Sequence, residues 1–255
     1  MNGIAKADRS PGAAEDGGAG AGAASVDKLM GLAVFGELTA ARTYNHMSKL
    51  RPEHGELLRK FAAMEGAHAS WFMGASRDNG INPDRDFAMQ ELGYLTDQVN
   101  EYSDAADFDS LAVVQGFIVE SLAIATYEPF LDIADRYPGS RVAFEQALRE
   151  EQYHVEWIKR YFRLRFYDAE DEFVALTEKV NVRGVDCVGG TMMNIARLLD
   201  EVGISGTDCA GALMDNYAAL LEEAGIERKA ATRNVVKLFT PLIKAYREQS
   251  DATAP

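Results

Sequence analysis

The sequence Glu65-Gly66-Ala67-His68 has the pattern Glu-x-x-His, and the same pattern occurs again at Glu151-Gln152-Tyr153-His154. Residues three apart lie on one face of an α-helix, so each Glu-x-x-His copy can direct a carboxylate and an imidazole toward a single point. A lone glutamate precedes each copy at a similar separation, Glu37 before the first and Glu120 before the second. The chain therefore carries a duplicated set of four carboxylates and two imidazoles.

This duplicated set predicts a dinuclear metal site inside a helical bundle. A four-helix bundle forms such a site from one Glu on each of two helices and a Glu-x-x-His on each of the other two. Glu120 is the only charged residue in the apolar run 111–127. A buried carboxylate needs a cation, a proton or a metal ion. The alternative, a buried pair with a basic residue, has little local support because no Lys or Arg occurs from 86 to 135.

The types of ligand indicate which metal the site prefers. Carboxylate oxygens with one imidazole for each metal suit two iron ions, and the same donors also accept manganese. Structural zinc sites are usually rich in thiolates, and Cys187 and Cys209 fit no metal-binding spacing. Two cysteines also provide no disulfide scaffold, which favours a reducing cytoplasmic location.

The rest of the chain predicts an all-α protein, a four-helix bundle with additional bracing helices. We expect a flexible Gly/Ala-rich tail over 1–25 and a di-iron domain over 26–250. Within the domain, the core bundle should span about 26–166 and the C-terminal helices about 168–247. Glycines at 203, 206 and 225 predict that these later helices are short.

Charge and hydropathy exclude several classes of partner. The net charge is −14 and the pI is about 4.8, so nucleic acid and anionic membranes are unfavourable partners. We expect no apolar run long enough to cross a bilayer.

A tyrosine follows each lone glutamate by seven residues, Tyr44 after Glu37 and Tyr127 after Glu120. Seven residues make two helical turns, so each tyrosine shares a face with its glutamate. These tyrosines are candidates to hydrogen-bond the ligand carboxylates, and the alternative is that they are ordinary core tyrosines.

The chain resembles ferritin-like di-iron oxygenases and, more narrowly, the cyanobacterial-type aldehyde-deformylating oxygenases (long-chain fatty aldehyde decarbonylases). The resemblance runs from about Val34 to Phe162 and extends more weakly to about Val236. It rests on matches beyond the ligands: Gly36-Glu37 with Tyr44 and Pro52; Met64-Glu65 with His68 and Phe72; Pro83-Asp84 with Phe87-Ala88; Gln115; Ala123-Ile124-Ala125 with Tyr127; Ala134-Asp135; Trp157-Ile158-Lys159; and Leu220 to Ile226.

The resemblance implies a di-iron centre held by Glu37, Glu65, His68, Glu120, Glu151 and His154. It also implies O2 and an external electron donor, such as ferredoxin and its reductase. The expected reaction cleaves an aldehyde into formate and a hydrocarbon one carbon shorter. An apolar substrate tunnel would pass candidates at Trp71, Phe72, Gln115, Leu122 and Phe130.

Two of these positions depart from the family pattern. Trp71 stands where a small residue is expected and would shorten the tunnel, unless it only packs on a neighbouring helix. Phe130 replaces a tyrosine. The alternatives are a di-iron oxygenase that hydroxylates, N-oxygenates or desaturates another small substrate, and a ferroxidase or iron-storage protein. An oxygenase should be a monomer or dimer, whereas storage proteins assemble into large shells.

Overall fold

The computed structural model describes residues 16–233, 235–236, 240, 244 and 248, without the side chains of 16–21 and 181–189. Every regular element in this described part is helical, as predicted. The elements are α1 (Asp16–Leu50), η1 (Pro52–His54), α2 (Gly55–Asp78), α3 (Arg85–Asp104), α4 (Phe108–Val113), η2 (Val114–Val119), α5 (Glu120–Phe130), η3 (Ala134–Arg136), α6 (Ser140–Asp168), α7 (Glu170–Val202) and α8 (Gly206–Ala224).

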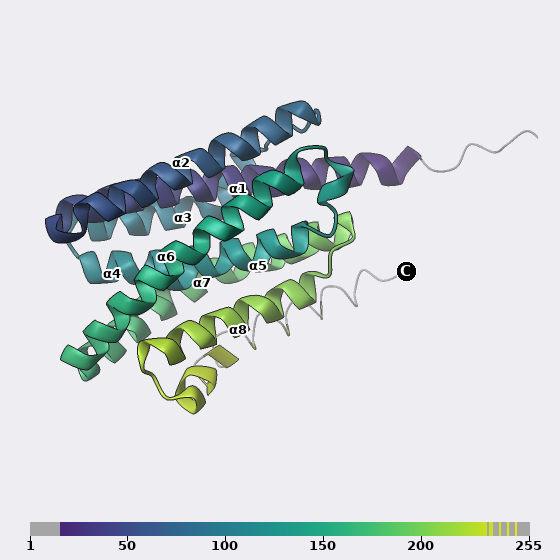
Figure 1. Cartoon of the computed structure of the whole chain (residues 1–255). Helices are drawn as coiled ribbons and strands as arrows, with labels where there is room; N and C mark the ends of the chain where they lie inside the picture. The colour runs from purple at the N-terminus through teal and green to yellow at the C-terminus, as the bar shows by residue number, and fades with distance from the viewer. Residues whose placement is uncertain (1–15, 234, 237–239, 241–243, 245–247, 249–255) are drawn as a thin grey trace, which may run out of the picture.

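Four long rods form the central bundle: α1, α2, the continuous rod α4–η2–α5, and α6 (Figure 1). The helix pair α1 and α2 packs together along much of its length, and α3 and α7 cover α1. Helix α8 lies against α5 and α6. The bracing helices thereby shield the rod that carries Glu120 from solvent.

Local sequence signals explain where several helices begin and end. The Asp84 carboxylate accepts a hydrogen bond from the backbone N–H of Phe87, and the Asp107 carboxylate accepts one from Ser110. Both residues therefore act as N-caps. Gly203 and Gly225 end α7 and α8 with φ of 87° and 118°, a left-handed conformation that favours glycine.

Two predicted boundaries are wrong. The first helix begins at Asp16, inside the segment 1–25 that was expected to be a flexible tail. The segment from Asp16 to Ala24 contains four glycines beside four alanines, and glycine disfavours a helix, so helix propensity does not explain this extension of α1. At its end the Ser25 hydroxyl donates to the carboxylate of Glu201 on α7. The predicted series of short C-terminal helices is instead a long α7 followed by α8. Gly206 does not stop a helix but is the first residue of α8.

The expectation that no apolar run could cross a bilayer also needs correction. The rod Phe108–Phe130 has 23 residues and a mean hydropathy of 1.5 in its most apolar window. However, 72% of that window is buried inside the protein, and the rod carries the buried Glu120. These properties are those of a core helix covered by its neighbours.

The middle of this rod is a π-helix, η2. Gly116 lies where η2 touches α6, and a Cβ there would meet Ile158 Cγ2 at 2.4 Å. Only a glycine therefore lets the two helices approach so closely.

We expect Gly116→Ala to lower the melting temperature by several degrees. The added methyl group must displace Ile158 and Phe162, and such overpacking costs about 1–3 kcal/mol. Thermal unfolding followed by circular dichroism would measure the change. Gly93→Ala on α3 is the matched control, because its Cβ would meet nothing within 4 Å. Equal melting temperatures for the two variants would contradict the close approach.

Candidate metal centre

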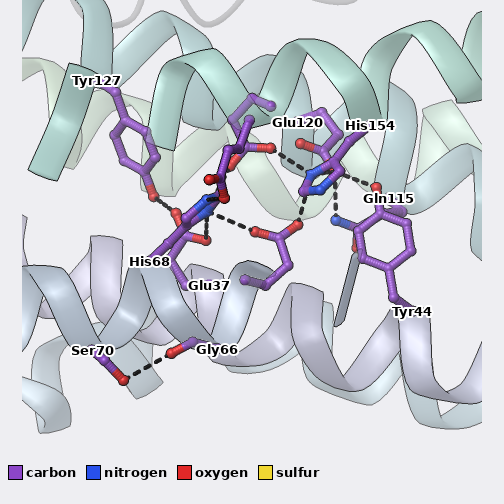
Figure 2. Close-up of polar contacts among 12 residues, drawn as sticks. Glu37, Tyr44, Gly66, His68, Ser70, Gln115, Glu120, Tyr127 and His154 are labelled. Atoms are coloured by element: carbon purple, nitrogen blue, oxygen red, sulfur yellow. Dashed lines mark hydrogen bonds and ion pairs between the residues drawn. The ribbon is translucent and has the colours of Figure 1, made fainter. Parts of the chain in front are cut away.

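The six predicted ligands meet at one place in the bundle core (Figure 2). Helix α1 contributes Glu37, α2 contributes Glu65 and His68, α5 contributes Glu120, and α6 contributes Glu151 and His154. All six are buried, with at most 3% of any residue exposed. The duplicated motif thus places one lone Glu and one Glu-x-x-His from each half of the chain around a single centre.

The first half-site surrounds the Nδ1 atom of His68. This nitrogen lies 3.2 Å from Glu37 Oε2, 3.2 Å from Glu65 Oε2 and 3.3 Å from Glu151 Oε1. These four residues each offer a ligand atom within 4.8 Å of the others. The spacing fits one metal ion held by three carboxylates and an imidazole.

The second half-site surrounds the Nδ1 atom of His154. This nitrogen lies 2.9 Å from Glu151 Oε2, 3.2 Å from Glu65 Oε1 and 3.8 Å from Glu120 Oε1. Glu65 and Glu151 belong to both half-sites. The two glutamates of the Glu-x-x-His motifs could therefore contribute to both half-sites, whereas Glu37 and Glu120 each belong to one.

The two tyrosines connect the halves crosswise (Figure 2). Tyr44 on α1 donates a hydrogen bond of 2.6 Å to Glu120 on α5, and Tyr127 on α5 donates one of 2.5 Å to Glu37 on α1. Burial, followed by the nearby carboxylates, raises the pKa of both phenols well above the usual value. Both phenols therefore stay protonated and can hold the carboxylates in place.

Gln115 occupies a position that α-helical spacing does not predict. Its amide nitrogen donates a 3.0 Å hydrogen bond to Glu120 Oε1. These two residues are five apart, a separation that points in different directions on an α-helix but is that of a π-helical turn, and Gln115 lies in η2. The π-helix thus brings a second donor to the Glu120 carboxylate.

The protonation of the cluster reflects its burial and its excess of carboxylates. Burial, with Glu151 as the next contributor, raises the pKa of Glu65 and of Glu120 well above the usual range. Burial disfavours the charged imidazolium, but hydrogen bonds to carboxylates outweigh it and raise the pKa of His68 and of His154. Burial also opposes ionisation of Glu151, yet hydrogen bonds from His154 and His68 keep its pKa below the usual value.

The cluster fits a dinuclear metal centre on its own chemistry. In the described part of the chain, no Lys or Arg forms an ion pair with any of the four carboxylates. Glu65 Oε1 is buried, makes no hydrogen bond with a described residue and lies 3.2 Å from His154 Nδ1. The cluster thus offers many carboxylate oxygens as metal ligands and has no Lys or Arg to neutralise them. Such a site suits two hard divalent ions.

An apolar cavity of about 70 Å³ adjoins the carboxylates. Glu37, Glu65, Glu120 and Glu151 lie on its wall, and most of the other lining residues are aliphatic or aromatic. The lining on α1 runs from Leu29 to Ala40, which corresponds to about 16 Å along a helix. This elongated apolar space beside the metal ligands suits a linear alkyl chain.

The structure separates the five tunnel candidates. Leu122 and Phe130 line the cavity, whereas Trp71, Phe72 and Gln115 do not. Trp71 packs beside the His68 ring at 5.3 Å between centroids, and Phe72 packs between Tyr127 and Phe144. Trp71 therefore does not shorten this cavity.

A profile of the long-chain fatty aldehyde decarbonylase family matches residues 23–240. The chain belongs to this family. The fold is also similar to that of a solved structure, protein 19 with aldehyde deformylating oxidase activity from Synechococcus. The two share 22% sequence identity with a TM-score of 0.80, over 88% of this chain and 100% of that one. The predicted ferritin-like fold and the predicted enzyme class are confirmed.

One residue in the centre of this decarbonylase was missed by the sequence analysis. Glu150 Oε2 lies 3.0 Å from Nε2 of His68, the ring nitrogen that faces away from the other carboxylates. Glu150 directly precedes the ligand candidate Glu151, and adjacent residues on a helix point in different directions. The Glu-x-x-His spacing therefore does not mark Glu150 as part of the site. In contrast, His154 Nε2 makes no hydrogen bond within the described residues and lies beside the Phe61 ring.

We expect Glu150→Ala to weaken metal binding about 10- to 100-fold, chiefly in the half-site of His68, because the carboxylate orients the ring and raises its basicity. Titration of the metal-free protein with Mn²⁺, followed by calorimetry, would measure the affinity. Glu156→Ala is the matched control, since Glu156 is exposed on the same helix and pairs with Lys159. Equal affinity in both variants would show that the Glu150 contact does not support the site.

Proposed function

We propose that this decarbonylase is a cytoplasmic, O2-dependent enzyme whose two iron ions are held by Glu37, Glu65, His68, Glu120, Glu151 and His154. The observation that carries the proposal is the pair of overlapping ligand groups at the end of an apolar cavity. The net reaction would convert an aldehyde, O2, four electrons and four protons into a hydrocarbon one carbon shorter, formic acid and water. Bound iron would supply the O2 chemistry, with electrons from an external carrier.

The side chains of this chain support the reaction in three ways. The shared carboxylates Glu65 and Glu151 would hold the two cations close together. The phenols of Tyr44 and Tyr127 fix Glu120 and Glu37. The apolar lining receives the alkyl chain and excludes water, so the carbonyl carbon reaches the carboxylate end of the cavity.

The size of the cavity bears on the substrate. Ligand pockets usually enclose about 300 Å³ or more, whereas this cavity encloses about 70 Å³. Binding a fatty aldehyde therefore requires lining side chains such as Met30, Leu122 and Phe130 to move apart. We therefore expect turnover to depend strongly on the length of the aldehyde. Separately, we expect the enzyme to be a monomer or dimer.

Product analysis tests the proposal. The protein would be loaded anaerobically with Fe²⁺ and supplied with O2, viologen reduced by dithionite, and aldehydes of graded length. Parallel loading with manganese would show whether that metal supports turnover. We expect formate and the one-carbon-shorter hydrocarbon in equal amounts. Consumption of O2 without either product would instead assign the site to oxygenation of a different substrate.

A further inference from the structure

A surface cleft of about 1010 Å³ lies over α1, the end of α2 and α3. Three large apolar side chains in it are unusually accessible, namely Leu38 at 51%, Met73 at 45% and Met89 at 50% exposed. Scattered exposed leucines need no explanation, but apolar side chains gathered in one cleft indicate a binding surface. Methionines favour such a role because they adapt to the shape of a partner.

The side chains that line this cleft have a net positive charge, opposite in sign to that of the whole protein. Arg42, Arg77 and Arg85 line the cleft, and Asp97 is the acidic member of the lining. All three arginines are exposed. Arg77 contacts the carboxylate of Asp78 at 3.7 Å, whereas Arg42 and Arg85 form no ion pair within the described residues. The lining of the cleft thus has an excess of positive charge on a chain with a net charge of −14, while Asp78, Asp84 and Asp86 adjoin its arginines in the sequence.

The cleft and the metal centre lie on opposite sides of α1. Val34, Phe35 and Leu38 face the cleft, whereas Ala33, Gly36 and Glu37 line the cavity at the carboxylates. Leu38 and Glu37 are adjacent in sequence. Because a helix with its side chains is about 10 Å across, a protein seated in the cleft would be separated from the centre by a single helix.

We propose that this basic cleft, defined by Arg42, Arg77 and Arg85 around Leu38, Met73 and Met89, docks an acidic one-electron carrier protein. The inference rests on the proposed function, whose net reaction takes up four electrons and four protons for each aldehyde and O2. The carrier would deliver these electrons one at a time, being oxidised by one electron in each encounter, while the protons come from water. An apolar centre with a charged rim suits such a brief contact.

Charge complementarity favours this occupant over the others. The net charge of the chain repels an acidic carrier over most of its surface and least at the three arginines of the cleft, so the cleft selects the orientation in which the carrier arrives. A basic carrier would be attracted to the remaining acidic surface instead. A second copy of this acidic chain would gain contacts at the cleft but meet repulsion around it.

The test uses the full iron-loaded chain with a plant-type [2Fe–2S] ferredoxin as the probe. The variant carries Arg42→Glu, Arg77→Glu and Arg85→Glu. The matched control carries Lys60→Glu, Arg160→Glu and Lys229→Glu, which changes the net charge equally at exposed positions outside the cleft. Both variants and the wild type would be compared for ferredoxin binding by calorimetry, and for turnover driven by ferredoxin or by reduced viologen.

We expect the cleft variant to weaken ferredoxin binding and to raise its KM by about tenfold or more, with a reduced dependence on salt. Turnover with reduced viologen should remain at the wild-type level, and the control should shift KM far less. Equal losses in both variants, or unchanged ferredoxin binding in the cleft variant, would overturn the proposal. Binding of phosphatidylserine vesicles through the arginines without binding of ferredoxin would also overturn it.

Failure of the proposed function has a different signature. In that case the wild type would yield no hydrocarbon or formate with reduced viologen, yet ferredoxin binding could still be measured by calorimetry. The docking surface and the reaction are therefore tested by separate readouts.

Discussion

We expect Glu120→Ala to lose the metal ion of the His154 half-site and to abolish measurable hydrocarbon formation. Glu120 is one of three carboxylates in that half-site and the one that is not shared with the other. Its removal also leaves the Tyr44 hydroxyl and the Gln115 amide without their buried acceptor. A buried donor without a partner costs about 1–3 kcal/mol, so the local geometry should loosen as well.

Metal content per chain, measured by plasma mass spectrometry, and product analysis would follow this variant. Glu128→Ala is the matched control, because Glu128 is exposed on the same helix, α5. The control should retain both ions and full turnover. An active Glu120→Ala variant with two irons per chain would show that the ligand assignment is wrong.

The second large effect concerns the stability of the metal-free protein as the pH changes. The folded state raises the pKa of Glu65, Glu120, His68 and His154. A group whose pKa is raised on folding contributes stability below its unfolded pKa, and that stability is lost as the pH rises through the folded pKa. Glu151, whose pKa is lowered, acts in the opposite direction but is outnumbered.

The metal-free protein should therefore become less stable as the pH rises. The loss of stability begins at the unfolded-state pKa, which is about 4.5 for the glutamates and about 6.5 for the histidines. Bound metal ions should remove most of this dependence, because they replace the protons that the cluster otherwise needs. Melting temperatures from pH 5 to 9, with and without saturating Mn²⁺, would measure the difference. We expect the difference in melting temperature between the Mn²⁺-loaded and the metal-free protein to widen by several degrees as the pH rises. For a chain of this size, each kcal/mol of stability corresponds to about 3 °C. If the difference in melting temperature instead became smaller as the pH rises, the predicted direction of the pH dependence would be wrong.

The ligand set could be predicted because it follows from spacing within helices. Two residues three apart on one helix share a face in any bundle, so Glu65 with His68 and Glu151 with His154 required no tertiary information. Tyr44 and Tyr127 could be predicted in the same way, because each lies two helical turns after a lone glutamate on the same helix face. Their crosswise pairing depends on how α1 and α5 lie relative to each other, which the spacing within one helix does not report.

Other features of the site could not be predicted for physical reasons. The contact of Gln115 with Glu120 depends on a π-helix, whose turn differs from the 3.6-residue period that sequence patterns use. The tunnel candidate Trp71 packs beside the His68 ring and does not line the cavity. Long-range packing decides both outcomes.

The rod Phe108–Phe130 has a consequence for how the chain must fold. It leaves the ribosome before the helices that cover it, because its neighbours α6 and α8 follow it in sequence. Until those helices are made, an apolar segment as hydrophobic as a membrane span can be covered only on the side that contacts α1 and α3. Assembly of the bundle is therefore completed late, and the segment most prone to aggregation is the one that carries Glu120.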